Sequence, residues 1–303
     1  MVKLLQRKDI DDERWNSVIA ASRHETIYPY TWYMDISADQ WFGLIMEDYE
    51  CVMPVAFKKK YSVKYIYQPF HTQQLGVYSE KPVDNEIVRM FLNKINSDFL
   101  MGNYAFNVGN ILREEPGYEV TDRPNYSLSL KNEYEQLYRN YNENTRRNIR
   151  KSCKSELEIS DKIDVAEFAE FKELNNEKRE SKAFYQNMNH LLLELDELEK
   201  IKVFGVYLGK ELCAATVFAY SDKRLIYLLS CSNSKGKEHR AMFHLVDTII
   251  RMYAGENLLL DFEGSSISSI ARFFAGFGAK PDIYQRIAFN RLPFKDLRKK
   301  KNV

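Results

Sequence analysis

The chain has 303 residues, of which 45% are apolar, and this is enough to build one large domain or two of medium size. Its 44 basic and 43 acidic residues nearly cancel, which excludes a protein whose whole surface is built to coat nucleic acid or an anionic membrane. No run approaches the ~20 apolar residues of a membrane span and no apolar signal core follows Met1, so the sequence predicts a cytoplasmic protein without a membrane span.

The first clear pattern is a β-hairpin at 42–57, where two apolar runs flank the polar turn "MEDYE". A strand at 64–70, a helix at 86–99 and a strand at 104–110 follow in that order. A last strand, from Tyr126 to Leu130, closes this half of the chain.

The middle of the chain reads as helical. Asn132 and Glu135 have the spacing of a capping box, so a helix is expected to begin there, and helical patterns continue to about Ser155. Two further helices are predicted at 165–180 and 189–200.

The second half repeats the order of the first. The segment 204–219 aligns without a gap on 42–57 and also reads as a hairpin. It is followed by a strand at 224–232, a helix at 241–254 and a strand at 258–265. The shared order predicts one duplicated α/β unit, with each hairpin in a sheet of its own.

This order of elements resembles the GNAT acetyltransferase fold in two tandem copies. Tandem copies are similar to the FemAB-like superfamily, which includes peptidoglycan ligases that use aminoacyl-tRNA and acyl-CoA-dependent relatives described as CelD-like acetyltransferases. The resemblance covers nearly the whole chain and rests on "NTRRNIRKS" at 144–152 and "LDFEGSSISSIARFFAGFG" at 260–278. It implies an α/β (α+β) protein of two GNAT-like domains, each a mixed, mostly antiparallel sheet flanked by helices. Residues 1–130 would form the acceptor pocket and residues 131–303 the acyl-donor site.

The resemblance implies acetyl-CoA or another acyl-CoA as co-substrate. A pyrophosphate needs backbone N–H groups and the positive end of a helix, and "SNSKGKEHRA" at 232–241 offers both, with basic residues and with Gly236 for backbone freedom. Asn233 and Glu238 depart from the Arg/Gln-x-x-Gly-x-Gly/Ala pattern of acetyltransferases, so a polar surface turn is the alternative. The residues expected to bind the donor are Leu229, Ser230, Cys231, Lys235, Gly236, Lys237, His239, Arg240 and Ala241, with the amides of Leu229 to Cys231 serving the oxyanion.

An amine acceptor must lose a proton, and Glu263, at the end of the strand 258–265, is the predicted general base. Its alternative role is to cap the next helix, and His239 and His244 are the substitutes. Tyr284 is the candidate acid for the departing thiolate. No metal is expected, because the four cysteines are scattered singly and form no C-x-x-C pair.

In the first half, the segment equivalent to the donor loop is "PFHTQQLGVYSEKPVD" at 69–84, which is neither basic nor rich in glycine. Such a loop suits a neutral or sugar-like acceptor better than CoA, and an irregular surface loop is the alternative. The residues expected to bind the acceptor are Tyr30, Trp32, His71, Gln73 and Gln74.

The stretch "NENTRRNIRKSCK" at 142–154 gathers five basic residues on one predicted helix. It is either a solvated face neutralised by nearby carboxylates or a binding site for the CoA 3′-phosphate or a tRNA backbone. The tRNA reading is disfavoured, because Fem-type ligases commonly carry Phe-Lys-x-x-Phe-Gly and this chain reads "FFAGFG" at 273–278. A long helical arm of the kind inserted for tRNA is also missing from the pattern.

The sequence therefore predicts an acyltransferase that moves an acyl group, foremost acetyl, from acyl-CoA to an amine or hydroxyl. The acceptor would be a small molecule or a sugar or peptide precursor of the cell surface. The rival predictions are a tRNA-dependent aminoacyl ligase and a non-catalytic binding module on the same fold. The pattern leaves the oligomeric state open.

Overall fold

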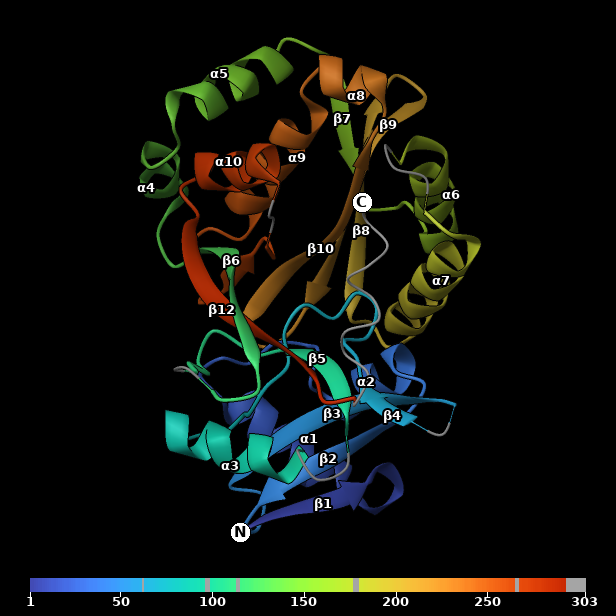
Figure 1. Cartoon of the computed structure of the whole chain (residues 1–303). Helices are drawn as coiled ribbons and strands as arrows, with labels where there is room; N and C mark the ends of the chain where they lie inside the picture. The colour runs from blue at the N-terminus through green and yellow to red at the C-terminus, as the bar shows by residue number, and fades with distance from the viewer. Residues whose placement is uncertain (62, 96–98, 113–114, 177–179, 265–266, 293–303) are drawn as a thin grey trace, which may run out of the picture. The chain divides into compact units, whose positions relative to one another are not determined.

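The structure is a computed structural model that describes residues 1–61, 63–95, 99–112, 115–176, 180–264 and 267–292 (Figure 1). The chain divides into two compact units: one is Pro124–Asp282, and the other joins Met1–Arg123 to the segment that begins at Ile283. This division lies earlier than the expected one between residues 130 and 131, and it returns the last strand of the chain to the first unit.

The first unit is built on a mixed sheet. Its elements are β1 (Val2–Gln6), a 3₁₀ turn (Arg7–Asp9), α1 (Asp12–Ala21), α2 (Thr31–Ser37), β2 (Trp41–Met46), β3 (Cys51–Lys60), β4 (Val63–Ile66), α3 (Asn85–Ile95), β5 (Met101–Ala105) and the greater part of β12 (Lys280–Asn290). The strand order is β1-β2-β3-β4-β5-β12, and only β4 and β5 are parallel. α3 buries Val88, Phe91, Leu92 and Ile95, which recur at the spacing of one helix face.

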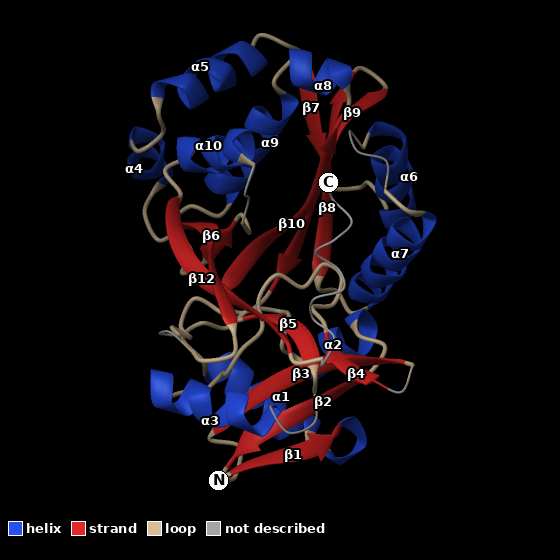
Figure 2. Ribbon diagram, in the orientation of Figure 1, coloured by secondary structure: helices blue, strands red, loops and turns tan. Residues whose placement is uncertain are grey.

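The second unit holds the remaining elements. They are β6 (Glu119–Ser129, which begins in the first unit), α4 (Tyr134–Arg139), α5 (Glu143–Ser152), β7 (Leu157–Ser160), α6 (Val165–Asn175), α7 (Lys182–Glu197), β8 (Ile201–Leu208), β9 (Glu211–Tyr220), β10 (Arg224–Ser232), α8 (Ser234–Glu238), α9 (Ala241–Met252), β11 (Leu259–Asp261) and α10 (Ser268–Gly276). The strand order is β6-β11-β10-β9-β8-β7, and α6 and α7 lie on one side of it with α9 and α10 on the other (Figure 2).

Both predicted hairpins form, as β2–β3 and β8–β9. Among the described residues, the strands are ordered as one 12-stranded ladder, and each hairpin lies in the part of that ladder that belongs to its own unit. β6 and β12 are long strands, and each of them has residues in both units. The hairpins also differ in their turns: Glu47 and Tyr49 take positive φ in the first, and Gly209 does so in the second.

The capping box expected at Asn132 and Glu135 does not form. Glu133 precedes the first residue of α4 and makes no side-chain cap. The next helix is capped instead, because the Asn142 side chain accepts a hydrogen bond of 2.8 Å from the Thr145 N–H. α5 is therefore the better anchored of the two helices.

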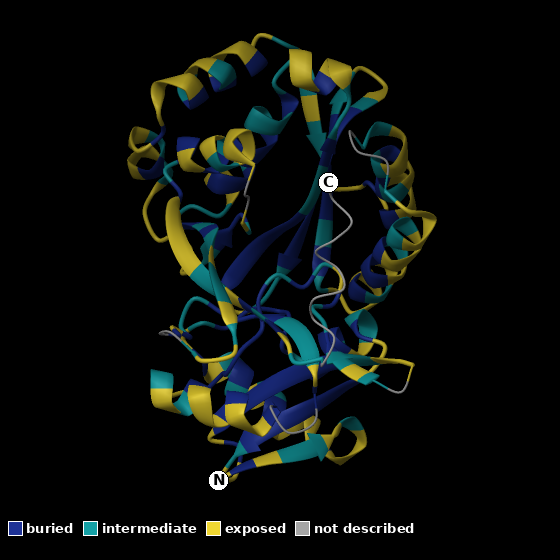
Figure 3. Cartoon of the chain, viewed as in Figure 1, coloured by how far each residue is buried: buried dark blue, intermediate teal, exposed yellow. Residues whose placement is uncertain are grey.

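In the second unit, buried apolar side chains form a core beneath the exposed residues of the surface (Figure 3). α9 buries Leu245, Val246, Ile249 and Ile250 against the sheet, as its apolar spacing predicts. Aromatic rings continue the core under α10, where Phe262 stacks on Phe274 with ring centroids 4.9 Å apart. Within the described ranges, no helix has both the length and the apolar character needed to span a membrane.

Candidate active site

The candidate site lies where β10 and β11 separate. The two strands pair in parallel only from Arg224 to Ile226, although β10 continues to Ser232. β11 ends because the Asp261 carboxylate accepts hydrogen bonds from Arg224 at 2.7 Å, from Asn125 at 3.0 Å and from the Glu263 N–H at 2.9 Å. Glu263 then turns the chain with a φ of 57°. Among the described residues, no strand pairs with the second half of β10 on this side, so its edge there is open.

A β-bulge decides which groups face that edge. The register of β10 against β9 shifts between Tyr227 and Leu229. Beyond the bulge, the Asn233 N–H donates to Cys213 of β9, so Cys231 also faces β9, while Ser230 and Ser232 direct their N–H and C=O groups to the open edge. The open edge therefore offers main-chain hydrogen-bonding groups to a ligand.

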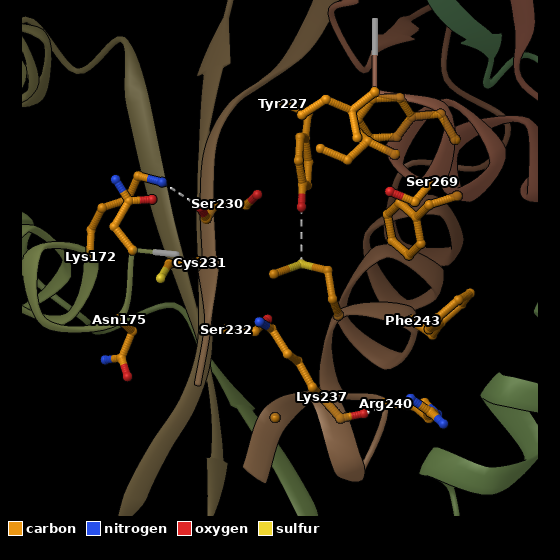
Figure 4. A pocket seen from close by; sticks show the side chains of 17 residues that line it. Lys172, Asn175, Tyr227, Ser230, Cys231, Ser232, Lys237, Arg240, Phe243 and Ser269 are labelled. Atoms are coloured by element: carbon orange, nitrogen blue, oxygen red, sulfur yellow. Dashed lines mark hydrogen bonds between the residues drawn. The ribbon is translucent and has the colours of Figure 1, made fainter. Parts of the chain in front are cut away.

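A cavity of about 590 Å³ follows this edge (Figure 4). In Figure 4, Lys172 and Asn175 of α6 lie on one side of β10, and Lys237, Arg240 and Phe243 lie on the other. The lining residues are Lys172, Asn175, Asn176, Tyr227, Ser230, Cys231, Ser232, Gly236, Lys237, Arg240, Met242, Phe243, Ile267, Ser269, Ile270, Phe273 and Phe274. The cavity lies wholly within the second unit.

The charges in the described lining have one sign. Lys172, Lys237 and Arg240 are cationic, and no aspartate or glutamate lines the cavity. Arg240 holds a left-handed backbone with a φ of 60°, and its Nη1 donates to the Lys237 C=O at 2.9 Å. The Arg240 Nε is buried and meets no acceptor in the part of the chain that the structure describes. A cavity so lined attracts anions.

A glycine is needed at position 236 because α8 packs closely on β9, and not because the backbone there takes a conformation that favours glycine. The expectation that Gly236 supplies backbone freedom is therefore wrong. Gly236 is buried inside α8, and its φ is not positive. A Cβ at this position would lie 2.2 Å from the Cys213 carbonyl oxygen, because α8 packs directly on β9. The glycine thus allows α8 to carry Lys237 to the mouth of the cavity.

The residues expected to bind the donor divide into two groups. Ser230, Cys231, Gly236, Lys237 and Arg240 line the cavity. The others, Leu229, Lys235, His239 and Ala241, do not. Lys235 pairs with Glu211 at the surface, the His239 Nδ1 is 2.8 Å from the Ser155 hydroxyl, Leu229 accepts a hydrogen bond from Thr216, and Ala241 is buried.

The structure does not bring the predicted acid and bases to the cavity lining. Glu263 is half-buried beyond the end of β11, and its C=O accepts a hydrogen bond from the Tyr126 N–H. Tyr284 lies in the part of β12 that belongs to the first unit. His244 lies in α9, where burial lowers its pKa, and it does not line the cavity either. Across the described ranges, no group of three His, Cys, Asp or Glu residues could hold a metal ion.

In the first unit, the predicted acceptor residues are partly brought together. The Tyr30 and Trp32 rings stack with centroids 5.3 Å apart, and the Tyr33 hydroxyl donates to the His71 C=O, which joins α2 to the loop 69–84. Gln73 and Gln74 are hydrogen-bonded to each other, and the buried Gln74 also accepts from the Val108 N–H. Gln74 thus holds the loop in place.

Sequence reasoning missed Lys172. It lies on α6, and its Nζ donates to the Ser230 C=O on the open edge of β10 at 2.9 Å. Burial lowers the pKa of this lysine, while the charges of Cys231 and Glu180 act in the opposite direction. Its position in the sequence could have pointed to it. Residues 165, 168 and 172 share one helix face, and two of them, Val165 and Phe168, are buried, so Lys172 lies on the packed face of α6.

The basic stretch 142–154 forms α5 and the turn after it. Arg146 donates to the Arg139 C=O at 2.6 Å, Arg147 to Asn144 at 2.9 Å, and Arg150 to Glu143 at 2.7 Å. Thr145 and Ile149 are buried against the unit, so this helix has one packed face and one basic solvated face. Internal partners therefore satisfy its three arginines in part.

No family model and no curated protein matches this chain. Solved structures share its fold. FemX has a TM-score of 0.68 at 10% sequence identity, over 96% of this chain and 98% of FemX. A tandem GNAT protein from the clavulanic acid biosynthesis pathway has a TM-score of 0.57 at 11% identity, over 97% and 99%. An acetyltransferase of the GNAT family from Colwellia psychrerythraea has a TM-score of 0.53 at 12% identity, over 96% and 100%. The chain thus shares the fold of FemX and of the tandem GNAT protein, as the resemblance in its sequence implied.

Proposed function

We propose that the protein is an acyltransferase that moves an acyl group from acyl-CoA to an amine or hydroxyl acceptor. The observation that carries the proposal is the open half of β10, with main-chain donors along a cavity whose described charged residues are all cationic. Main-chain groups at Ser230 and Ser232 would bind the amides of the pantetheine arm, and Phe243 and Phe273 would pack against it. Lys237 and Arg240 would bind its phosphates.

In the proposed reaction, the acceptor nitrogen or oxygen bonds to the acyl carbon and the carbon–sulfur bond breaks. The acceptor proton leaves and the thiolate takes up a proton, so free CoA and the acylated acceptor are the products. N–H groups on the open edge of β10 would stabilise the negative charge that develops on the carbonyl oxygen. Two points remain predictions from the sequence. One is that the first unit forms the acceptor pocket, and the other is that the acyl group is acetyl.

Calorimetric titration tests the donor. We expect acetyl-CoA to bind with a one-to-one stoichiometry and to raise the melting temperature, since a ligand that binds only the folded state stabilises it. Uncharged and aminoacylated tRNA serve as the competing ligands. Salt-sensitive binding of tRNA without binding of CoA would favour the aminoacyl ligase, because phosphate contacts release counterions. Binding of neither would favour the non-catalytic module.

The role of Glu263 is tested separately by Glu263→Gln. A general base in the cavity would lose about 10²–10⁴-fold in turnover on this change. Because Glu263 does not line the described cavity, we expect turnover to stay within a few-fold of the wild-type value and the acidic limb of the pH–rate profile to be retained. A hundredfold loss together with loss of that limb would establish the carboxylate as the base.

A further inference from the structure

The cavity has two cationic regions, one on each side of β10. Lys237 and Arg240 form the first, and the proposed function assigns it to the donor phosphates. Lys172 forms the second, on the α6 side (Figure 4). The donor explains one region and leaves the other without a role.

Lys172 has hydrogen-bonding capacity to spare. An ammonium group has three N–H donors, and the Ser230 C=O takes one of them. In the described part of the chain, no carboxylate pairs with its Nζ, and Glu180 acts on it only through its charge. A partly buried ammonium without a counter-ion is costly, and an anionic ligand would remove this cost.

Two amides, those of Asn175 and Asn176, also line the cavity and follow Lys172 along the chain. The Asn175 Nδ2 donates to Phe171 within the helix at 2.9 Å, and the Asn176 Nδ2 donates to the Tyr185 hydroxyl at 3.1 Å. Each of these bonds uses one of the two N–H groups of its amide, so the other N–H and the side-chain oxygen are left to a ligand. Oxygens accept hydrogen bonds, so they suit the N–H donors of an amine.

We infer that the acceptor carries an anionic group beside its amine, and that Lys172 binds the anionic group while Asn175 and Asn176 receive the amine. An amino acid or an amino sugar bearing a carboxylate or a phosphate has this chemistry. The site is distinct from the acceptor residues predicted in the first unit, all of which precede residue 75. Only the identification of the anion as part of the acceptor rests on the proposed function.

The test needs no known acceptor, because it measures the reactivity of Lys172 itself. The protein is treated with trace acetic anhydride, and acetylation of Lys172 is quantified by mass spectrometry with succinate, inorganic phosphate or the neutral succinamide present at constant ionic strength. A bound anion raises the pKa of the ammonium group and covers it, so less of the reactive neutral amine remains. We expect succinate or phosphate to slow the labelling several-fold and saturably, and succinamide to leave it unchanged.

Two matched controls locate the effect. Lys154 is exposed on the same unit, and its labelling should not respond to any of the three compounds. In Lys237→Met, which removes a cation from the other side of β10, the protection of Lys172 should persist. Protection by phosphate alone would identify a phosphate-bearing acceptor, and protection by succinate alone a carboxylate-bearing one.

Equal protection by succinamide, or no protection by either anion, would overturn the inference. Titration of acetyl-CoA into the same preparations separates this result from a failure of the proposed function. If CoA binds and the anions leave Lys172 unprotected, the anion site is wrong and the donor assignment stands. If the anions protect Lys172 and CoA does not bind, the anion site stands and the donor assignment is wrong.

Discussion

Replacement of Arg224 by methionine is expected to lower the free energy of unfolding by about 3–5 kcal/mol, as is typical when one partner of a buried ion pair is removed. The guanidinium lies 2.7 Å from the Asp261 carboxylate, and the two side chains are only 8% and 3% exposed. Methionine keeps most of the side-chain volume, so the loss reports the charge left buried at Asp261. Urea denaturation followed by circular dichroism measures it.

The double variant Arg224→Met/Asp261→Leu is the control for this result. It removes both charges, and replacement of a whole buried pair by apolar residues is often neutral. We expect it to recover most of the stability lost in Arg224→Met, although Asn125 and the Glu263 N–H then lose an acceptor. A single variant that unfolds at the wild-type urea concentration would show that the pair does not hold the end of β11.

Removal of either cation at the donor side should weaken the binding of acetyl-CoA about tenfold to a hundredfold, since a hydrogen bond to a charged group contributes about 1.5–3 kcal/mol. The variants are Lys237→Met and Arg240→Met, and calorimetry gives the dissociation constants. The effect should be absent with S-acetylpantetheine, which lacks the phosphates. This comparison assigns the loss to the charge and not to a change in the shape of the cavity.

Lys235→Met is the matched control for the donor side. Lys235 lies two residues before Lys237 and carries the same charge, but it pairs with Glu211 and does not line the cavity. Its replacement should leave the affinity for acetyl-CoA unchanged. If all three variants lose affinity equally, the general positive field of this surface, and not a phosphate site, attracts the ligand.

Most of the fold could be predicted because its pattern is local. The hairpins, the helix at 241–254 and the duplicated order of elements follow from apolar periodicity, and the structure confirms them as β2–β3, β8–β9 and α9. The strand predicted at 258–265 is only Leu259–Asp261, because the carboxylate of Asp261 bonds across the sheet to Arg224 and turns the chain. Periodicity carries no information about such a distant ion pair.

The candidate site was predicted less well, for a similar reason. The donor loop was located from its glycine and its basic residues, but the glycine serves a contact with Cys213 on another strand. Within the loop, Lys235 and Lys237 are equivalent in composition, and only the tertiary structure separates the surface pair from the cavity residue. Lys172 lies some sixty residues before the loop, on a helix to which the sequence assigned no part in the site.

The return of β12 also fixes the order in which the protein can be completed on the ribosome. Residues Arg286–Asn290 pair with Met101–Ala105, so β5 has β4 as a neighbour early but gains its second neighbour only after residue 290 has been translated. At about 5–20 residues per second, the nascent N-terminal unit spends roughly ten seconds or more with that strand edge unpaired. An exposed edge is a template for wrong pairing with other chains, which makes this interval the time when a chaperone would matter most. The first unit therefore cannot complete its sheet until the segment that follows the second unit has been synthesised.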